Sequence, residues 1–572
     1  MRVLGFSGSH DSSVCIVNDG EIEYFGKEER YSRTKRDKQP WKAFDAAIAA
    51  AKGPIDYAVL QNPSLQPVAS DLFFAYLIKK LGLNKNQIYD MTKDAHHRSH
   101  AFFAFNNCPW DKALVFVVDR NGSQIFDPAD EPVKFDQSAE SYHTNWIGRE
   151  TESVYIFKQP NGLEAIHKSF WMVNASNPRS YRNRTNGYSE FHVKMKEKYP
   201  KADLCFKSGY GITKVYESGT TLIGQDAMEN GKTMGLSSYG EPKGFPPLFV
   251  GSTPIDHHFI HDAEFVNVAF ETLPRHKHHY PNVTELNYKP LANWAYHIQR
   301  ETEKALNHLV QRYVKKTGIK KVCLVGGYAL NVVANNYLIS NNPDVEFYFE
   351  PNADDTGVAI GAAMFAYRQQ TRDPNKYPLK DTFYHYLEPQ DPVEGEPSTP
   401  HEIAALLTQG NSIALYDGNP EAGPRALGHR SILYDPRSKD AKKNINKVKN
   451  REWYRPFAGI ILEKYFDEYF ETLGLESSPN MTINFKAKQK AIDNCPGVIH
   501  VDDTCRVQTV TEGFMYEVLL EFHAITGVPV LLNTSFNLAG QPLVHTKGDA
   551  LNTLHSSDLD YVYFVQDNAL IQ

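Results

Sequence analysis

Residues 5–13 read Gly-Phe-Ser-Gly-Ser-His-Asp-Ser-Ser and join two strand-like apolar runs near the start of the chain. A hairpin turn at residues 18–20, Asn-Asp-Gly, then predicts a third strand over 21–26. A turn rich in glycine and serine exposes backbone N–H groups that can approach a phosphate closely. His10 and Asp11, at the tip of this turn, are residue types that act as a base or orient an acceptor. An ordinary tight hairpin turn is the alternative for the same residues.

Two later turns also follow buried strands. A strand predicted over 113–118 ends at Asp119, and a strand predicted over 321–325 ends at Gly326 and Gly327. Paired glycines between a strand and a helix let a nucleotide base or ribose pack against bare backbone, although a plain strand-to-helix turn explains them equally well. This order of a phosphate-type loop, an aspartate loop and a Gly-Gly turn predicts a duplicated α/β nucleotide-binding fold of the actin and sugar-kinase type.

The composition is that of a folded protein, because 41% of the 572 residues are hydrophobic and 23% are charged. A chain of this length exceeds one ordinary core and predicts two or more domains. The formal net charge of -7 argues against an extended nucleic-acid surface. The six cysteines form no C-x-x-C pair, and no stretch has the ~18–20 apolar residues of a membrane span. We therefore expect a cytoplasmic protein that has no membrane partner.

Proline and charged residues crowd residues 371–400, and this composition predicts a linker between a domain over 1–370 and a second domain over 401–572. Residues 123–215 are polar and aromatic and lack clear periodicity. We interpret them as an insertion in the first domain that shapes the pocket for an acceptor substrate. Helices are expected over 41–52, 68–83, 292–317 and 357–368.

Two histidines and two aspartates form a candidate metal site. His96 and His100 are four residues apart, so a helix would present both on one face. Asp119 ends a buried strand and Asp355 precedes a helix, and such places gather ligands in α/β folds. Imidazoles together with carboxylates favour Fe(II) or another divalent metal. Because the chain has 22 histidines, a chance pair at this spacing is the alternative.

A basic stretch from 425 to 455 carries ten lysines and arginines against three acidic residues in an acidic chain. Arginine clusters clamp phosphates through forked hydrogen bonds, so Arg425 and Arg455, which lie in apolar neighbourhoods, are candidates for an anion site. The lysines over 439–449 fit a solvated helix face equally well.

An apolar strand predicted over 528–532 places Asn533 and Ser535 at its polar end. Small amide and hydroxyl groups there can bind phosphate or a carbamoyl-like amide. A segment that caps a helix is the alternative.

Several of these segments, taken together and in this order, resemble the ATP-dependent O-carbamoyltransferases of the nodulation, cephamycin and tobramycin type. The resemblance extends over nearly the whole chain. The segments that carry it are 27–30, 96–101, 231–236, 326–331, 423–431, 451–458, 506–510 and 532–537.

The resemblance implies two catalytic domains. The first is similar to the tRNA-modifying protein Kae1, with an actin-like (ASKHA) fold and an iron site, and the second is similar to YrdC, with a twisted α/β sheet. In such enzymes carbamoyl phosphate and ATP, the latter with Mg²⁺, form carbamoyl-adenylate and pyrophosphate at the YrdC-like site. A hydroxyl of the acceptor, which is a sugar, natural product or nucleotide, then attacks this intermediate at the Kae1-like site.

The same resemblance assigns roles to individual residues. His10 and Asp11 would face the acceptor. The metal ligands would be His96, His100, Asp119 and Asp355; the nucleotide contacts would be Lys232, Gly326, Gly327 and Asn331; and the carbamoyl phosphate and ATP phosphates would be held by Arg425, Arg455, Arg506, Asn533 and Ser535.

Two other functions are compatible with parts of the pattern. A tRNA threonylcarbamoyl-type transferase uses both domain types, but the composition shows no basic RNA-binding surface. A non-catalytic nucleotide- and metal-binding protein of the actin-like superfamily would bind ATP without consuming carbamoyl phosphate. The related hydrogenase-maturation carbamoyltransferases carry zinc-finger C-x-x-C motifs that this sequence lacks.

Overall fold

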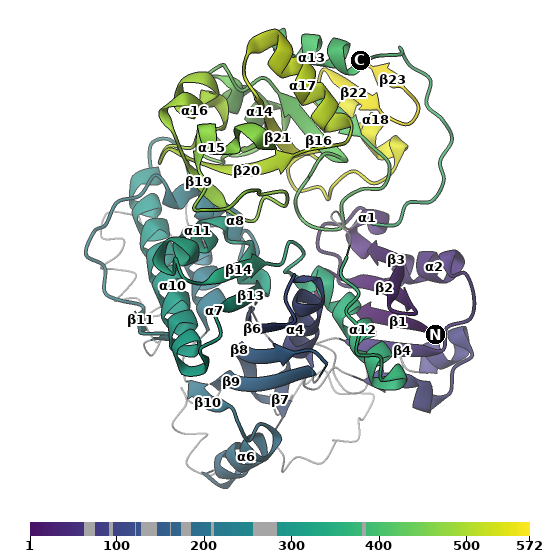
Figure 1. Ribbon diagram of the computed structural model, residues 1–572, viewed down its shortest axis with the longest axis vertical. Coiled ribbons are helices and arrows are strands. Elements are labelled where there is room, and N and C mark those ends of the chain that lie inside the picture. Colours follow the sequence, from purple (N-terminus) through teal and green to yellow (C-terminus); the bar gives the residue numbers. More distant parts are fainter. Residues whose placement is uncertain are drawn as a thin grey trace.

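The computed structural model describes residues 1–61, 75–90, 95–120, 122–126, 146–160, 162–172, 185–207, 211–254, 283–379 and 385–572. The N-terminal part is built on two large sheets, and the C-terminal part is built on one sheet of nine strands. In Figure 1 the C-terminal part lies across one end of the N-terminal part. Among the helices that the structure describes, none has the length and apolar character needed to span a membrane.

The first sheet has the strand order β3-β2-β1-β4-β5. Its strands are β1 (Arg2–Ser7), β2 (Ser13–Asn18), β3 (Glu21–Lys27), β4 (Tyr57–Gln61) and β5 (Ile88–Asp90). The central strand β1 pairs antiparallel with β2 and parallel with β4, and β5 continues the parallel side. Phe44 of α2 (Trp41–Ala50) packs in the same core cluster as Leu4 and Phe6 of β1.

The second sheet has the order β10-β9-β8-β6-β13-β14, with β7 paired to β8. Its strands are β6 (Lys112–Val118), β7 (Gln124–Phe126), β8 (Trp146–Lys158), β9 (Gly162–Met172), β10 (Asp203–Lys207), β13 (Lys321–Val325) and β14 (Glu346–Phe349). The central strand β6 pairs antiparallel with β8 and parallel with β13, and β14 continues the parallel side. The five strands from β9 to β14 thus repeat the pairing pattern of the first sheet, and this repeat confirms the duplicated, actin-like α/β fold.

The interpretation of residues 123–215 as an insertion differs from the structure. The described part of this range contains β8 and β9, which correspond to β2 and β3 of the first sheet. Buried charges hid these strands from the hydrophobic pattern, because Glu150 on β8 and Lys168 on β9 form an ion pair inside the sheet. Residues 127–145 and 173–184 of the range lie outside the described residues.

Helices of the N-terminal part connect and cover the two sheets. They are α1 (Glu28–Ser32), α2, α4 (His96–Asn107), α6 (Thr185–Lys198), α7 (Ile212–Leu222), α8 (Asn230–Ser237), α10 (Tyr288–Thr317), α11 (Val332–Asn341) and α12 (Val358–Thr371). Three expected helices are confirmed with shifted ends as α2, α10 and α12. Of the helix expected over 68–83, residues 75–81 are helical and residues 68–74 lie outside the described residues.

The C-terminal sheet has the order β18-β19-β20-β17-β21-β16-β15-β22-β23 and mixes parallel and antiparallel pairs. Its strands are β15 (Ile413–Tyr416), β16 (Arg430–Tyr434), β17 (Ala458–Leu462), β18 (Phe470–Glu471), β19 (Asn484–Ala487), β20 (Thr504–Val510), β21 (Val530–Ser535), β22 (Tyr561–Phe564) and β23 (Ala569–Ile571). Its helices are α13 (Pro400–Thr408), α14 (Ala441–Val448), α15 (Phe466–Tyr469), α16 (Gln489–Asn494), α17 (Phe514–Thr526) and α18 (Lys547–His555). A YrdC-like fold for this part stays a prediction.

The chain between the two parts has no helix at residues 372–379 or 385–399, the portions that the structure describes. One β-bridge, between Glu396 and Leu570, ties it to the C-terminal sheet. A backbone N–H of Lys27 donates to Nε2 of His385 over 2.7 Å, so the same segment also contacts the first sheet.

Close packing of β1 against α12 depends on Gly5. A Cβ atom at this position would lie 2.1 Å from the carbonyl oxygen of Ala359 on α12. We expect Gly5→Ala to destabilise the N-terminal part by about 2 kcal/mol, because the helix must move away from the sheet. Urea denaturation measures this change. Gly231→Ala is the matched control, since no atom lies within 4 Å of its added methyl group, and equal stability of the two variants would contradict the prediction.

Candidate active site

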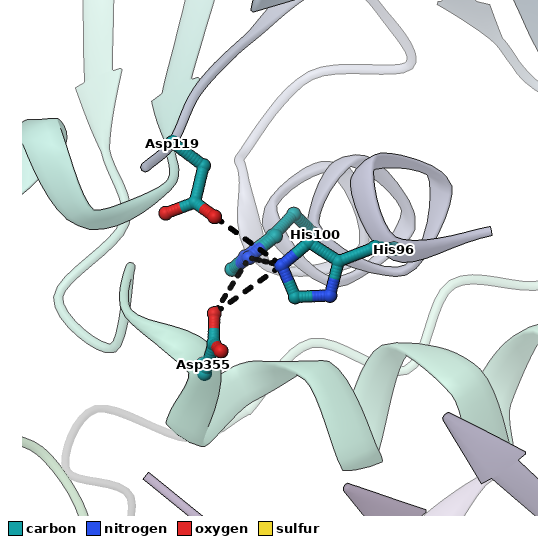
Figure 2. A group of neighbouring side chains, drawn as sticks. All are labelled: His96, His100, Asp119 and Asp355. Carbon is teal, nitrogen blue, oxygen red and sulfur yellow. Dashed lines mark hydrogen bonds and ion pairs between the residues drawn. The ribbon is translucent and has the colours of Figure 1, made fainter. Parts of the chain in front are cut away.

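The four side chains predicted as metal ligands meet in one buried group (Figure 2). His96 and His100 lie in the first turns of α4, Asp119 follows β6, and Asp355 begins a 3-10 turn just before α12. Nε2 of His96 lies 3.3 Å from Oδ2 of Asp119 and 3.3 Å from Oδ1 of Asp355. Nε2 of His100 lies 3.3 Å from the same Oδ1 and 3.3 Å from Nε2 of His96. One potential ligand atom from each residue falls within 4.8 Å of the others.

The Gly-Gly turn after β13 positions Asp119 in this group. The backbone N–H of Gly327 donates to Oδ1 of Asp119 over 3.0 Å, which leaves Oδ2 facing the imidazoles. Gly326 has a φ of 92° and packs so closely on the end of the neighbouring strand β6 that a Cβ would lie 2.5 Å from the carbonyl oxygen of Val118. A side chain at Gly326 would therefore push the Asp119 loop out of place.

The electrostatics of the group suit a bound cation. Although burial opposes the effect, attraction to Asp355 and Asp119 raises the pKa of His96 to about 10. The imidazoles in turn lower the pKa of both carboxyl groups despite their burial. Oδ1 of Asp355 is buried, faces both imidazoles at 3.3 Å, and has no partner with hydrogen-bond geometry among the described residues. Two imidazole nitrogens and two carboxylate oxygens, converging in a buried place, fit a divalent metal ion.

His10 and Asp11 stand beside this group. Nδ1 of His10 lies 2.6 Å from Oδ2 of Asp11, and its Nε2 lies 3.8 Å from Oδ2 of Asp355. Asp11 is also held by Nζ of Lys27 at 2.8 Å. Burial opposes protonation, but the carboxylates of Asp355 and Asp11 raise the pKa of His10 to about 9. The turn thus offers an imidazole that is 24% exposed and is oriented by a carboxylate next to the metal-type group.

The predicted nucleotide contacts make other contacts in the structure. Gly327 binds Asp119 through its N–H, as described above. The side-chain amide of Asn331 exchanges two hydrogen bonds with Gln299, of 3.1 and 3.0 Å, and caps α11 by accepting from Ala334 N–H. Nζ of Lys232 lies between carboxylates of Glu229 and Glu452. A nucleotide role for these residues stays a prediction.

Five cationic side chains gather in the C-terminal part, namely Arg425, Lys449, Arg451, Arg455 and Arg506. Burial and the neighbouring Arg455 lower the pKa of Arg425 to about 10, although Asp354 counteracts them. Burial and neighbouring cations also lower the pKa values of Arg451, Arg506 and Lys449 well below their usual range. Burial and mutual repulsion of these cations would both be offset by a bound anion, so the cluster is a candidate anion site.

Lys449, like Arg451, is a residue of this cluster to which sequence reasoning assigned no role. It is 3% exposed, and its Nζ donates to Oδ1 of Asn537 at 3.0 Å and to the backbone oxygen of Ser535. It thereby fixes the polar end of β21, where Ser535 Oγ donates to Asn537 Oδ1 at 2.6 Å. The local signal in the sequence is a lysine that directly follows a basic helix.

Asn533 also faces this cluster from β21. Its Nδ2 donates to Gln508 and to the backbone of Ala426, but its Oδ1 is buried and has no hydrogen-bond partner among the described residues. An unpaired buried acceptor is costly, so a donor from a ligand such as a carbamoyl NH₂ group would stabilise it.

Other cations of the basic stretch serve the fold or the surface. Arg430 is completely buried, donates to the backbone of Gly418 at 2.8 Å, and stacks on the ring of Tyr416. Arg437 and Lys447 have exposed side chains and pair with Asp435 and Asp558 at 2.6 and 2.9 Å. The alternative of a solvated helix face therefore holds for part of the stretch.

The two sites adjoin each other across the domain boundary. Nη2 of Arg425, from the C-terminal part, donates to the carbonyl oxygen of Leu330, next to the Gly-Gly turn, over 3.0 Å. In Figure 1 the helices α8 and α11 lie at this boundary. The 3-10 turn over Gly327–Leu330 therefore contacts the cation cluster through Arg425 and the metal-type group through Asp119.

A duplicated actin-like fold that carries a buried metal-type group, joined to a sheet with a cation cluster, defines a protein with two candidate sites, one suited to a cation and one suited to an anion. The family comparison specifies the class. The family model for the carbamoyltransferase N-terminus matches residues 66–364, and the model for the carbamoyltransferase C-terminus matches residues 404–572. The chain belongs to the carbamoyltransferase family and is therefore an enzyme, a transferase, rather than a non-catalytic binding protein.

Relatives in distant organisms match nearly the whole of this chain. An uncharacterized protein of Methanocaldococcus jannaschii is 31% identical, covering 98% of this chain and 97% of its own. An uncharacterized protein of Synechocystis is 27% identical over 98% of this chain and 95% of its own. The nodulation protein NolNO of Sinorhizobium fredii is 25% identical over 96% of this chain and 77% of its own.

Proposed function

We propose that this protein is an ATP-dependent O-carbamoyltransferase that works through carbamoyl-adenylate. The observation that carries the proposal is the cluster of five mutually repelling cations beside Asn533, in a chain of the carbamoyltransferase family. ATP and carbamoyl phosphate together bring enough negative charge to satisfy such a cluster. Overall, carbamoyl phosphate, ATP and water give carbamoyl-adenylate, phosphate and pyrophosphate. Water breaks the P–O bond of carbamoyl phosphate and releases phosphate, and the carbamate oxygen then bonds to the α-phosphorus of ATP as the bond to pyrophosphate breaks.

The second step of the proposal takes place at the metal-type group. His96, His100, Asp119 and Asp355 would hold Fe(II) or another divalent ion, which would neutralise phosphate charge and polarise the carbamoyl oxygen. His10, oriented by Asp11, lies within reach of this place. A cation bound at Asp355 would offset the negative charge that raises the pKa of His10, so that the neutral imidazole would accept the proton of the acceptor hydroxyl. The carbonyl carbon then forms a bond to the hydroxyl oxygen, the bond to AMP breaks, and AMP leaves. Mg²⁺ would accompany ATP at the cation cluster.

The direct test is ATP–pyrophosphate exchange, measured with purified protein and no acceptor. We expect labelled pyrophosphate to enter ATP only when carbamoyl phosphate is present, because the adenylate must form before it can be reversed. Exchange without carbamoyl phosphate, or release of ADP in place of AMP, would contradict adenylate formation. A panel of sugars and nucleotides, analysed for added carbamoyl mass, then identifies the acceptor.

A further inference from the structure

Helix α8 of the N-terminal part contacts the segment 451–455, which carries Arg451 and Arg455 of the cation cluster. Nζ of Lys232, on α8, lies 2.6 Å from Oε1 of Glu452 and 2.7 Å from Oε1 of Glu229. Glu452 belongs to the C-terminal part, where Nη1 of Arg455 lies 3.6 Å from its Oε2. A single carboxylate therefore joins a lysine of one part to a phosphate-site candidate of the other.

Contacts around this ion pair hold the same junction together. Nε2 of His500 donates to the carbonyl oxygen of Gly235, on α8, over 3.1 Å. Just after α8, the ring of Tyr239 packs edge-on against Trp453 at 5.2 Å, and its hydroxyl accepts from Nζ of Lys442 at 2.7 Å. The segment around Glu452 thus rests on α8 rather than on the C-terminal sheet alone.

Charge explains why the segment needs this support. Arg451, Arg455 and Arg506 repel one another, and each such repulsion favours swinging Arg455 away from the cluster. Glu452 is the acidic side chain that lies next to Arg455, and Lys232 fixes its orientation by binding the opposite oxygen. The side chains of Lys232 and Glu452 are only 18% and 28% exposed, so solvent screens this interaction partly.

We propose that Lys232 and Glu452 are positioning residues, which place Arg455 for phosphate and complete the cation site only when α8 is docked on the C-terminal part. This inference rests on the proposed function and changes the role assigned to Lys232, from a nucleotide contact to a residue that acts through Glu452. Adenylate formation in the C-terminal part then depends on docking of the N-terminal part, where the transfer takes place. Occupancy of the phosphate site would in turn strengthen docking of α8.

A double-mutant cycle with Lys232→Met and Glu452→Gln tests the inference. Calorimetric titration with inorganic pyrophosphate reports the phosphate site without requiring catalysis. We expect each single variant to weaken pyrophosphate binding about tenfold, and the double variant to be no weaker than Glu452→Gln alone, because both changes interrupt the same relay. Lys232→Arg keeps a positively charged donor for Glu452. We therefore expect this variant to retain pyrophosphate binding within about threefold of the unchanged protein.

Controls separate this role from a general loss of stability. Lys289→Met removes the partner of Glu241, at 2.6 Å, on the same part of the chain but away from the cation cluster, and should leave pyrophosphate binding unchanged. Additive losses in the double variant would instead place Lys232 directly on the ligand, and unaltered binding in both single variants would also overturn the inference. Failure of the proposed function shows differently, because the unchanged protein would then bind pyrophosphate without catalysing exchange.

Discussion

Replacing Asp355 by asparagine is expected to weaken metal binding at least a hundredfold. The substitution keeps the volume of the side chain but removes the charge that both imidazoles face, at 3.3 Å each. A neutral amide oxygen is a far poorer ligand for a divalent ion than a carboxylate, and even loss of an outer hydrogen-bond partner costs about 10–100-fold in affinity. Anaerobic titration with Fe(II), and with Co(II) as a spectroscopic probe, measures the change.

Exchange of ATP with pyrophosphate should survive this substitution within about threefold, since the cation cluster that we assign to adenylate formation lies in the other part of the chain. Transfer to a hydroxyl acceptor should fall about a thousandfold, because polarisation by a metal contributes several kcal/mol to the transition state. Loss of transfer with exchange retained indicates a metal role in transfer, whereas a structural role of Asp355 would lower both activities.

Asp354→Asn provides the matched control. Asp354 is the neighbouring carboxylate on the same turn, but its oxygen accepts the backbone N–H of Thr356 and it lies outside the converging group. The asparagine amide oxygen can keep this hydrogen bond, so metal affinity should stay unchanged. If Asp355→Asn bound metal as tightly as Asp354→Asn, the assignment of the ligand set would be wrong.

Turn chemistry and strand ends allowed much of the N-terminal site to be predicted from the sequence. The helix that carries His96 and His100 and the strand that ends at Asp119 are both present, and the four side chains meet as expected. Their placement follows from local rules, because i,i+4 residues share a helix face and buried strands end in polar loops. A metal at this place stays a prediction, as do the roles of the individual residues.

Long-range pairing of buried charges could not be predicted. The ion pair of Glu150 with Lys168 makes two strands of the second sheet look polar, so the repeat was hidden in residues that resembled an insertion. For the same reason, the sequence motif around Lys232 indicated a ligand contact, whereas its partner Glu452 is 220 positions away in the numbering. Spacing rules describe neighbours on one element and carry no information on partners from another domain.

Replacing Arg425 by alanine is expected to lower ATP–pyrophosphate exchange by about 10²–10³-fold. Its guanidinium stays protonated at neutral pH, since burial and Arg455 lower its pKa only to about 10. It is partly fixed by its hydrogen bond to the carbonyl oxygen of Leu330, so a donor is preorganised where phosphate charge develops. Removing one such donor from a site of this kind costs about 10²–10³ in rate.

Arg437→Ala is the control that makes this loss specific. Arg437 lies in the same basic stretch, but two of its nitrogens bind the carboxylate of Asp435, at 3.0 and 2.6 Å, so its charge is already balanced. We expect exchange within about twofold of the unchanged protein, because a partly exposed cation whose charge is already paired contributes little. If both variants lost exchange equally, the stretch would act through its overall charge and Arg425 would have no special place. If Arg425→Ala kept full exchange while remaining folded, adenylate formation would have to be assigned to other residues than this cluster.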